Sequence, residues 1–466
     1  MPTSSVGSWR LVGAHWAIAV LTTLGLAAPV SRAADQPSPD VTADHERRIK
    51  ELEDTIKQLK REQPEPEPVT GGPRLFATYA DGFVFGTTDG QFKLILRGYM
   101  QGDGYFFINN HTVSSSQFLM RRVRPVLEGT VFRNFDFKVM PDFAGSKATL
   151  FDAYLDVNYI PELRLQAGKF KAPLGLERLE SARHLLFVER GLTKDLVPVR
   201  DIGIQLHGDL FGGALSYATG IFNGAPDYGN PDSDANSDKD FDGRVFAQPW
   251  KKTEVAPLKG LGFGIAGSYG HEHGSTSNTD LPAYITSAQV TFFNYVTNSS
   301  DPAKTAIALG THSRISPQGY YFWGPLGLLA DYVTSGQGVA GGGKSASLRH
   351  NAWQAVGSYV LTGEAATFDG VTPAHPFNPW TGTWGALQVA ARYATLDVDQ
   401  DAFRNGFADP TKSARQAKEW AVGANWYLNS NVKFVLDYSN TDFKGGTAHG
   451  DRPTEKVILS RLQIAF

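Results

Sequence analysis

A dense run of ionisable side chains lies between Lys171 and Val199, and it holds more bases than acids. Around a narrow, poorly screened, water-filled passage, lysine and arginine side chains lower the energy barrier for anions. The run therefore predicts an anion pathway if the fold encloses it. The alternative is that each charge only solvates the enclosed lumen. The bases are Lys171, Arg178, Arg183, His184, Arg190 and Lys194, and the acids are Glu177, Glu180, Glu189 and Asp195.

Three other patterns resemble ligand-binding motifs, and each lacks a part that the chemistry needs. The segment Gly338–Ser345 (GVAGGGKS) fits a phosphate-binding loop, but its flanks alternate as strands where a following helix is required. The segment Asp232–Gly243 resembles a calcium loop, but Pro249 stands where the bidentate glutamate belongs. His271 and His273 share one face of a strand without an evident third metal ligand. We therefore predict no catalytic residue, no cofactor and no metal site.

Composition and the N-terminus indicate an exported protein. The 466 residues include no cysteine, which excludes a disulfide framework, and the net charge of −3 does not favour nucleic-acid binding. Arg10 precedes the apolar run Leu11–Val30, and the tripeptide Ser31–Ala33 has small residues at its two ends, as a cleavage site does. Residues 1–33 are therefore predicted to be a cleaved signal peptide, with an uncleaved membrane anchor as the alternative.

Residues 34–73 are predicted to form a short coiled-coil helix followed by a proline-rich linker. Ile49, Leu52, Ile56 and Leu59 repeat at spacings of 3, 4 and 3, which makes a seam of two heptads. An isolated helix of this length is marginal in water, so we expect it to pair with copies of itself or to lie on another surface. The alternative is a solvated, charged helix without a role. The linker, QPEPEPV, favours an extended spacer.

From residue 74 to residue 466 apolar and polar residues alternate in strand-like runs, of which we count about 16 from Gln91 onward. Tight connections such as YIPE and LNSN occur between long polar stretches. Short turns at one end and long loops at the other are typical of an outer-membrane barrel. We therefore predict an all-β fold, a 16-stranded antiparallel transmembrane β-barrel over residues 74–466. The expected long loops are Gly224–Lys239, His271–Lys304, Gly363–Thr383 and Asp397–Arg415.

A series of motifs follows one another along the chain: FLMRRVRPVLEGTVFRNFDFKVMPDF (Phe118–Phe143), LQAGKFKAPLGLERLES (Leu165–Ser181), VRDIGIQLHG (Val199–Gly208), DFDGRVFAQPW (Asp240–Trp250) and the terminal LQIAF. In order and content they resemble the phosphate- and polyphosphate-selective porins of Gram-negative outer membranes, the outer-membrane porins O and P. The resemblance runs across nearly all of residues 82–466. It implies a trimeric barrel that passes anions by passive diffusion, and a third loop that folds into the lumen as a constriction.

That third loop corresponds to Lys171–Val199, the run of charges described above. The resemblance and the alternation of the strands together give two sets of candidate residues, although a slip of one residue would reverse the facing of a strand. The predicted constriction residues are Arg122, Arg124, Lys169, Lys171, Arg178, Arg183, His184 and Arg190. The predicted further lumen charges are Lys93, Arg97, Asp103, Glu128, Asp152, Arg392, Lys433 and Arg461.

The chain ends on Phe466, at the end of an alternating strand. Leu462 and Ile464 are predicted to face lipid, and Arg461 and Gln463 to face the lumen. The resemblance implies that the barrel-assembly machinery reads this terminal aromatic residue. The expected partners are therefore the outer-membrane lipid bilayer, two further copies of the chain in a homotrimer, the assembly machinery and small anionic solutes, with no nucleic acid.

One loop departs from the family pattern. Phosphate-specific members carry arginines at alternate positions of a fifth loop that dips inward, whereas the corresponding stretch here, His271–Lys304, contains no arginine. We therefore predict an outer-membrane porin, a passive diffusion channel for small hydrophilic solutes that prefers anions, and leave phosphate specificity open. The alternatives are a barrel enzyme, or a receptor or adhesin that uses the long outer loops.

Overall fold

The computed structural model describes residues 47–55, 57–58, 72–108, 114–145, 147–234 and 236–466. They fall into two units, one within Thr3–Arg74 and one within Leu75–Phe466. In the first unit residues 47–55 are helical, and Ile49 and Leu52 are exposed on that helix. Ile56, Leu59 and the predicted signal peptide lie outside the described residues, so the coiled-coil pairing and the cleavage remain predictions. No described helix is long and apolar enough to cross a membrane.

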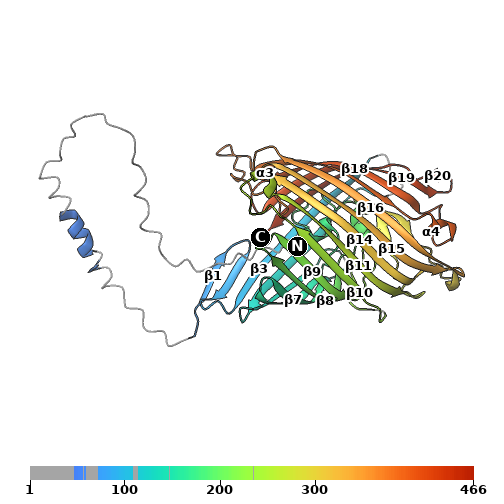
Figure 1. Cartoon of the computed structure of the whole chain (residues 1–466). Coiled ribbons are helices and arrows are strands. Elements are labelled where there is room, and N and C mark those ends of the chain that lie inside the picture. Colours follow the sequence, from blue (N-terminus) through green and yellow to red (C-terminus); the bar gives the residue numbers. More distant parts are fainter. Residues whose placement is uncertain (1–46, 56, 59–71, 109–113, 146, 235) are drawn as a thin grey trace. The chain divides into compact units, whose positions relative to one another are not determined.

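In the second unit the described residues form sixteen antiparallel strands that close into a barrel, because the last strand pairs with the first strand of the wall (Figure 1). This closure confirms the predicted all-β, 16-stranded fold. The wall consists of β3 (Lys93–Phe107), β4 (Gln117–Val131), β5 (Phe135–Asp142), β6 (Thr149–Ile160), β7 (Leu163–Phe170), β8 (Asp201–Leu210), β9 (Leu215–Phe222), β10 (Asp240–Ala247), β11 (Leu261–His273), β14 (Ile307–Trp323), β15 (Leu326–Gly341), β16 (Lys344–Val360), β17 (Ala386–Asp397), β18 (Ala414–Tyr427), β19 (Val432–Thr447) and β21 (Glu455–Ala465).

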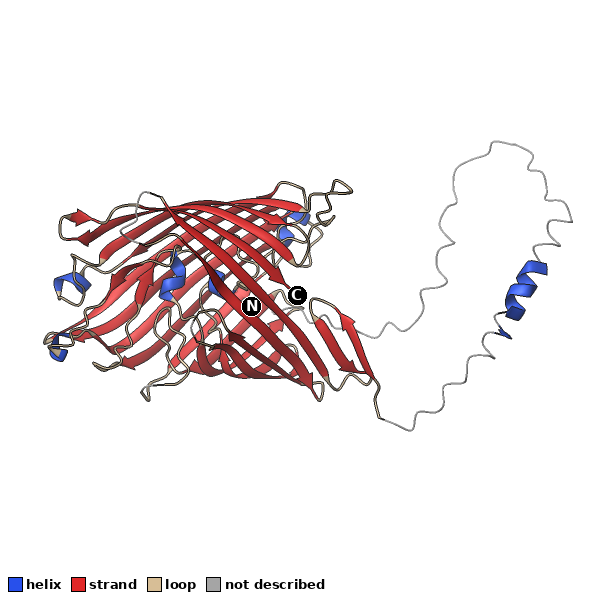
Figure 2. Ribbon diagram, turned by 180° about the vertical axis from the view of Figure 1, so that it is seen from behind, coloured by secondary structure: helices blue, strands red, loops and turns tan. Residues whose placement is uncertain are grey.

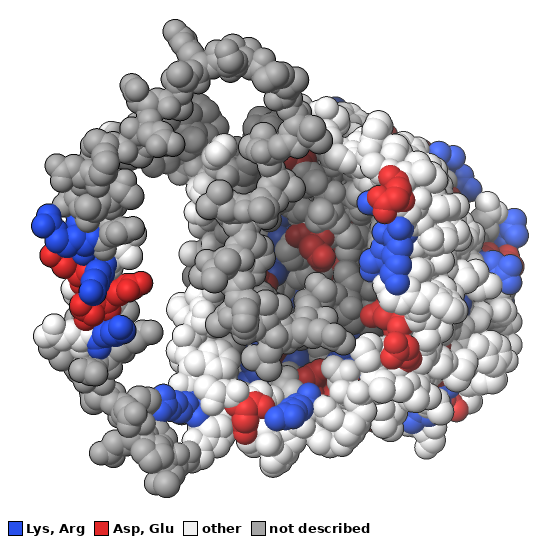
Figure 3. All heavy atoms as spheres, turned by 60° about the vertical axis from the view of Figure 1, so that its left-hand side comes forward, with Lys and Arg blue, Asp and Glu red and all other residues white. Residues whose placement is uncertain are grey.

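The two faces of the wall differ as the period of two in the sequence requires. On β21, Leu462 is 59% exposed on the outer face, whereas the neighbouring Arg461 is 1% exposed and lies on the lumen face. The same contrast separates Ile204, 57% exposed, from Gln205, 1% exposed, on β8. Figure 3 shows charged side chains gathered toward the ends of the barrel, with a largely uncharged wall between them. An apolar outer band is what a barrel presents to lipid.

One predicted long loop lies at the opposite end of the barrel from the one expected. Strands β15 and β16 are joined by Gly342 and Gly343, whose φ angles of 59° and 75° are those of a tight hairpin turn that favours glycine. This tight turn occupies the end that carries most of the long loops. Since the chain reverses at every strand, the next connection, residues 361–385, falls at the end with the short turns. The prediction that Gly363–Thr383 is a loop of the long-loop end is therefore wrong.

A hairpin that is not part of the wall precedes β3. Strand β1 (Leu75–Tyr79) pairs with β2 (Phe83–Thr87), and β2 pairs with the first residues of β3. The rest of β3 pairs with β21, so the hairpin lies beside the C-terminus, as Figure 2 shows. The ring of Phe83 lies 6.3 Å from the ring of Phe466, centroid to centroid. The N-terminal hairpin and the end of the chain thus meet at the short-turn end of the barrel.

Several connections carry short elements of their own. Residues 171–200 contain α2 (Leu176–Leu179) and η1 (Leu192–Leu196), and residues 274–306 contain β12 (Ala283–Ile285), β13 (Thr291–Asn294) and η2 (Pro302–Lys304). Most residues of the first connection are buried, and so are many of the second. Because a long polar loop is normally exposed, this burial shows that both connections fold back onto the barrel. The remaining elements are α3 (Ala256–Lys259), α4 (Asp401–Arg404) and β20 (Gly450–Asp451).

The facing of the wall can be tested on two adjacent residues of β8. We expect Ile204→Glu to lower the yield of folded barrel in lipid vesicles, because it places a charge against hydrocarbon. Gln205→Glu is the matched control, since it puts the same charge on the lumen face and keeps the side-chain shape. The yield is measured as the fraction of protein that migrates as the heat-modifiable form on a gel. Equal losses in the two variants would contradict the assigned facing.

Candidate constriction site in the barrel lumen

The connection between β7 and β8, residues 171–200, crosses the lumen, and we call it the lumen loop. Its backbone carbonyls accept hydrogen bonds from side chains on strands at the other side of the closed wall. Since a buried carbonyl without a partner is costly, these bonds fix the path of the loop. The donors are Gln101 of β3 to Ala182 (3.0 Å), Asn425 of β18 to Leu186 (2.7 Å), Lys433 of β19 to Leu185 (2.9 Å) and Gln463 of β21 to Arg183 (3.0 Å).

Glu189 anchors the lumen loop to the wall through arginine side chains. Its carboxylate lies 2.8 Å from Arg121 Nε, 2.9 Å from Arg122 Nη2 and 3.2 Å from Arg461 Nη2. Burial alone would raise the pKa of Glu189, but these three guanidinium groups hold it well below its usual range. Arg461 also donates to both oxygens of Asp103, at 2.8 and 2.7 Å. A charged, hydrogen-bonded cluster therefore joins β3, β4 and β21 to the loop.

Arg121 belongs to this cluster although strict alternation turns it away from the lumen. The pairing of β3 with β4 shifts between Gln101 and Gly102, so that Arg122 faces Gln101 and Met120 faces Gly102. Arg121 is thus an extra residue at a β-bulge, which re-aims its side chain inward beside Arg122. A bulge leaves no signal in a single sequence, and this is why the sequence predicted Arg122 and Arg124 but not Arg121.

Most of the predicted lumen charges are compensated by a partner of opposite sign. Among the predicted constriction residues, Arg122 pairs with Glu189, Arg124 with Asp142 (2.7 Å), Lys169 with Asp232, and Arg183 with Asp81 (2.7 Å). Among the further charges, Arg97 pairs with Glu128 (2.5 Å), Asp152 with Arg200, Arg392 with Glu419 (2.7 Å), and Arg461 with Asp103 (2.7 Å). Lys93 begins β3 and is half-buried. The role of all these charged residues in conduction remains a prediction.

A second group of cations is held by backbone carbonyls instead. Lys171 donates to the carbonyls of Leu179 (2.9 Å) and Glu180 (2.8 Å), and Arg178 donates to that of Lys194 (2.7 Å). Arg190 donates to the carbonyls of Glu177 (2.8 Å) and Glu180 (2.6 Å). No carboxylate of the described residues lies within 4.0 Å of these three cations. We call Lys171, Arg178 and Arg190 the carbonyl-held cations, since a carbonyl carries no net charge that would cancel theirs. Burial and the nearby Arg200 and Arg190 guanidinium groups hold the pKa of Lys171 well below its usual range, so the charge of the group rests chiefly on its two arginines.

His184, which the sequence groups with the cations, is neutral in this site. It accepts a hydrogen bond from Arg183 Nε at 2.8 Å through Nε2. Burial and the adjacent Arg183 guanidinium lower the pKa of His184 to about 2. At neutral pH His184 therefore orients Arg183 and adds no positive charge of its own.

Arg244 is a lumen-facing cation that the sequence reasoning missed. It lies on β10 opposite Ala218 and Ala266, donates from Nε to Gln318 at 3.3 Å, and stacks 4.6 Å from the ring of Phe246. No carboxylate of the described residues pairs with it within 4.0 Å. The alternation within DFDGRVFAQPW, which turns every second residue inward, was the signal that could have found it.

The connection 274–306, which we call the aromatic loop, brings rings rather than cations into the barrel. Tyr284 and Phe293 are stacked at 5.2 Å between ring centroids, and both are fully buried. Tyr295 lies beside them and shares a hydrogen bond of 2.8 Å with His350 of β16. The loop also touches the lumen loop, since Lys194 donates to the carbonyl of Ile285 at 2.7 Å. It therefore packs as a small apolar core against the wall.

The motifs set aside in the sequence also have ordinary partners. His273 contacts Asp238, and Asp234 forms an ion pair with Lys239 at 2.6 Å. Among the described residues no three acidic, histidine or cysteine side chains are grouped so as to hold a metal ion. Gly338–Ser345 forms the β15–β16 hairpin turn and its flanks, with no helix after it.

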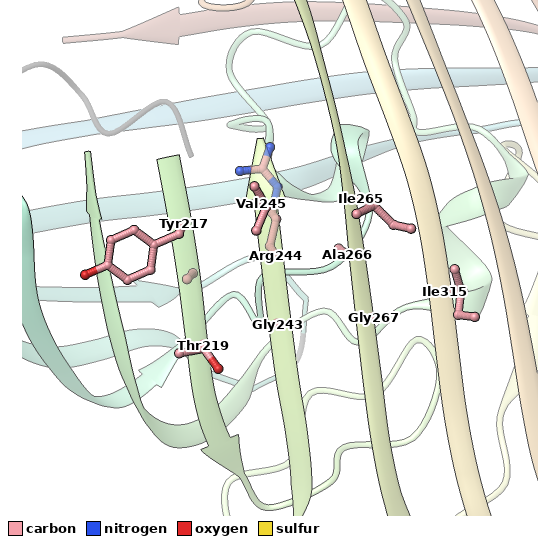
Figure 4. A pocket seen from close by; sticks show the side chains of 10 residues that line it. Tyr217, Thr219, Gly243, Arg244, Val245, Ile265, Ala266, Gly267 and Ile315 are labelled. Carbon is pink, nitrogen blue, oxygen red and sulfur yellow. The ribbon is translucent and has the colours of Figure 1, made fainter. Parts of the chain in front are cut away.

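A surface hollow lies on the outer wall rather than in the lumen (Figure 4). It is lined by side chains from β9, β10, β11 and β14, among them Tyr217, Val245, Ile265 and Ile315. Gly243 and Gly267, which have no side chain to fill it, form part of its floor. Since the outward side chains of this face are apolar, the hollow does not belong to the path of a hydrophilic solute.

The anchoring role of Glu189 can be tested by proteolysis. Glu189→Gln keeps the size of the side chain but leaves the buried guanidinium groups without their shared anion. Removing one partner of a buried ion pair lowers the free energy of unfolding by roughly 3–5 kcal/mol. We expect trypsin to cut the lumen loop of the folded barrel at least about tenfold faster in this variant, because local opening precedes cleavage. Glu162→Gln, in the turn between β6 and β7, is the control. Equal cleavage rates in the two variants would contradict the anchor.

The fold is similar to that of outer-membrane channels of known structure. The outer-membrane channel DcaP of Acinetobacter baumannii matches with a TM-score of 0.52 at 13% identity, over 82% of this chain and 99% of that one. OmpF of Salmonella typhi, in a complex with daunomycin, matches with a TM-score of 0.50 at 12% identity, over 84% of this chain and 100% of that one. At such identities the likeness concerns the barrel fold alone.

The sequence comparisons are more specific than the fold. Porin O of Pseudomonas aeruginosa is 24% identical over 440 residues, which cover 85% of this chain and 94% of that protein. The family model described as phosphate-selective porin O and P matches residues 94–466, which include the whole wall apart from the first residue of β3. With a closed 16-stranded barrel and a charged loop across its lumen, the chain belongs to the family of phosphate-selective porins O and P and is an outer-membrane porin.

Proposed function

We propose that this porin passes small hydrophilic solutes by passive diffusion and prefers anions moderately. The observation that carries the preference is the group of carbonyl-held cations, Lys171, Arg178 and Arg190, on the loop that crosses the lumen. Positive charge that no carboxylate neutralises lowers the barrier for an anion in a narrow aqueous passage. The compensated pairs around Glu189 shape the passage and contribute less to its field.

The carbonyl-held cations favour anions only moderately because acids lie close to them. The side chain of Glu177 interacts electrostatically with Arg178 and Arg190, whereas burial and this neighbouring acid raise the pKa of Glu180 to about 8. Lys433, on the wall, donates to the carbonyl of Leu185 at 2.9 Å and lies beside the group. The net charge of the cluster is therefore positive but small.

High specificity for phosphate does not follow from this arrangement. A binding site for phosphate is commonly built from several arginine or lysine donors that converge on one anion. The aromatic loop carries Tyr284, Phe293 and Tyr295 into the barrel and contains no arginine. We therefore propose that phosphate passes as one anion among others, without a tight site on this loop.

Export and assembly complete the proposal. We propose that residues 1–33 are removed on export, that the porin is a homotrimer, and that the barrel-assembly machinery reads the strand ending at Phe466. In support of the last point, Phe466 donates from its backbone N–H to Gly98 at 3.0 Å and accepts from Gly98 at 2.8 Å, so the final residue closes the barrel. The helix over residues 47–55, with Ile49 and Leu52 exposed, fits an association between copies.

The anion preference is tested by reversal potentials in planar bilayers under a potassium chloride gradient. We expect the wild type to favour chloride, and Arg190→Gln to lower the chloride-to-potassium permeability ratio by roughly twofold to fivefold. The reason is that a unit charge 4 Å from a monovalent ion changes the energy of that ion by about 1 kcal/mol even in bulk water. Arg133→Gln removes the same charge from an exposed turn outside the lumen and is expected to leave the ratio unchanged. A wild type that prefers potassium would refute the proposal.

Phosphate is tested as a blocker of the chloride current in the same bilayers. We expect half-block only at about millimolar phosphate or above, because the free energy of binding then stays near or weaker than about −4 kcal/mol. Sulfate serves as the control, since an unspecific cationic passage should treat the two anions alike. Block by micromolar phosphate would show that the lumen holds a specific site.

A further inference from the structure

The turn of the N-terminal hairpin places a carboxylate at the short-turn end of the lumen. Asp81, between β1 and β2, adopts a φ of 51°, in the left-handed region that non-glycine residues seldom occupy. Gly82 follows with a φ of 134°, and a Cβ added there would lie 2.9 Å from the carbonyl oxygen of Leu96. The turn is therefore pressed against β3 so closely that only glycine fits beside the aspartate.

The carboxylate of Asp81 contacts two of the predicted lumen cations. Arg183, on the lumen loop, donates to it through both terminal nitrogens, at 3.1 and 2.7 Å. Arg97, on β3, donates to it at 3.0 Å. A segment outside the sixteen-stranded wall thus meets the lumen loop and compensates part of its charge.

A second acidic segment approaches Arg183. In the connection 361–385, a Cβ added to Gly370 would lie 3.1 Å from Nδ1 of His184, and the neighbouring Asp369 interacts electrostatically with both Arg183 and Asp81. Arg183 thus interacts with two acids that are far apart in the sequence. Asp81 is the one in direct contact with it.

The contact matters more for the field in the passage than for the fold. The side chain of Asp81 is 56% exposed and that of Arg183 is 20% exposed, and ion pairs at such sites contribute little to stability. Asp81 nevertheless compensates the charge of Arg183 at the short-turn end of the lumen. Without Asp81, the guanidinium of Arg183 would attract anions to this end of the lumen.

We infer that Asp81 is a selectivity-determining residue, which holds the anion preference of the pore down by compensating Arg183, whereas Arg97 keeps Glu128 as a second partner. This inference rests on the proposed function, since it concerns the selectivity of that same passage. It assigns to the N-terminal hairpin a part in permeation, although the hairpin does not belong to the wall of the barrel.

The test compares Asp81→Asn with Asp89→Asn by reversal potentials in bilayers of the full-length porin. Both substitutions remove one negative charge from a turn of the N-terminal hairpin region, but the carboxylate of Asp89 accepts hydrogen bonds from its own turn, from Thr87 and Gln91. We expect Asp81→Asn to raise the chloride-to-potassium permeability ratio by roughly twofold at about 0.1 M salt, where the screening length is about 10 Å. The increase should shrink at about 1 M salt, where the screening length is about 3 Å.

A double variant separates the charge effect from a change of structure. Asp81→Asn combined with Arg183→Gln should return the ratio close to that of the wild type, since the unmasked charge is then gone. An unchanged ratio in Asp81→Asn, equal shifts in Asp81→Asn and Asp89→Asn, or a shift that survives in the double variant would each overturn the inference while leaving the proposed pore intact. A wild type that conducts no ions would overturn the proposed function itself.

Discussion

The meeting of Glu189 with the arginines of the wall is the interaction on which the rest of the lumen depends. A loop of about thirty residues that leaves the wall at β7 can cross a barrel only if its buried polar groups find partners on the wall strands that it reaches. Arg121, Arg122 and Arg461 supply them for the Glu189 carboxylate. Wall side chains supply them for the carbonyl of Glu189 and for carbonyls that precede it. The anchor therefore sets where the loop lies, and with it the position of every cation that the loop carries.

The same anchor explains why a lumen rich in arginine is only weakly basic. Arginine is well suited to a buried pair because its planar guanidinium can serve two acceptors, as Arg461 does with Asp103 and Glu189. Each such pair removes a charge from the field that a solute meets. The positive charge that remains includes the carbonyl-held cations and Arg244, none of which has a carboxylate partner among the described residues. We therefore expect the selectivity of the passage to depend on the loop backbone as well as on side chains.

Much of the fold could be predicted because the period of two in the sequence is a direct consequence of strand geometry. It gave sixteen strands and the facing of Leu462 and Arg461 without any three-dimensional information. Two features of the fold could not be predicted from the sequence, for physical reasons. The bulge at Arg121 breaks the period locally, and the Gly342–Gly343 turn, too short to stand out, moves residues 361–385 to the other end of the barrel.

The candidate site was less predictable than the fold. The sequence located the charges of the lumen loop, but not their partners, because the pairs join residues far apart in the chain, such as Arg461 with Glu189 and Arg183 with Asp81. Pairing decides which cations keep their effect, so a list of basic residues alone overstates the positive field. Arg244 was missed although the alternation of its strand turns it inward, beside the acids Asp240 and Asp242.

The central claim is that the lumen loop lies in the path of the ions. The chain has no cysteine, so a single introduced thiol can be modified without a competing site. We expect a charged methanethiosulfonate reagent to lower the single-channel conductance of Arg190→Cys in discrete steps and to leave that of Ile204→Cys, on the outer face of β8, unchanged. A conductance of Arg190→Cys that the reagent does not alter, although mass spectrometry shows the thiol to be modified, would contradict the account.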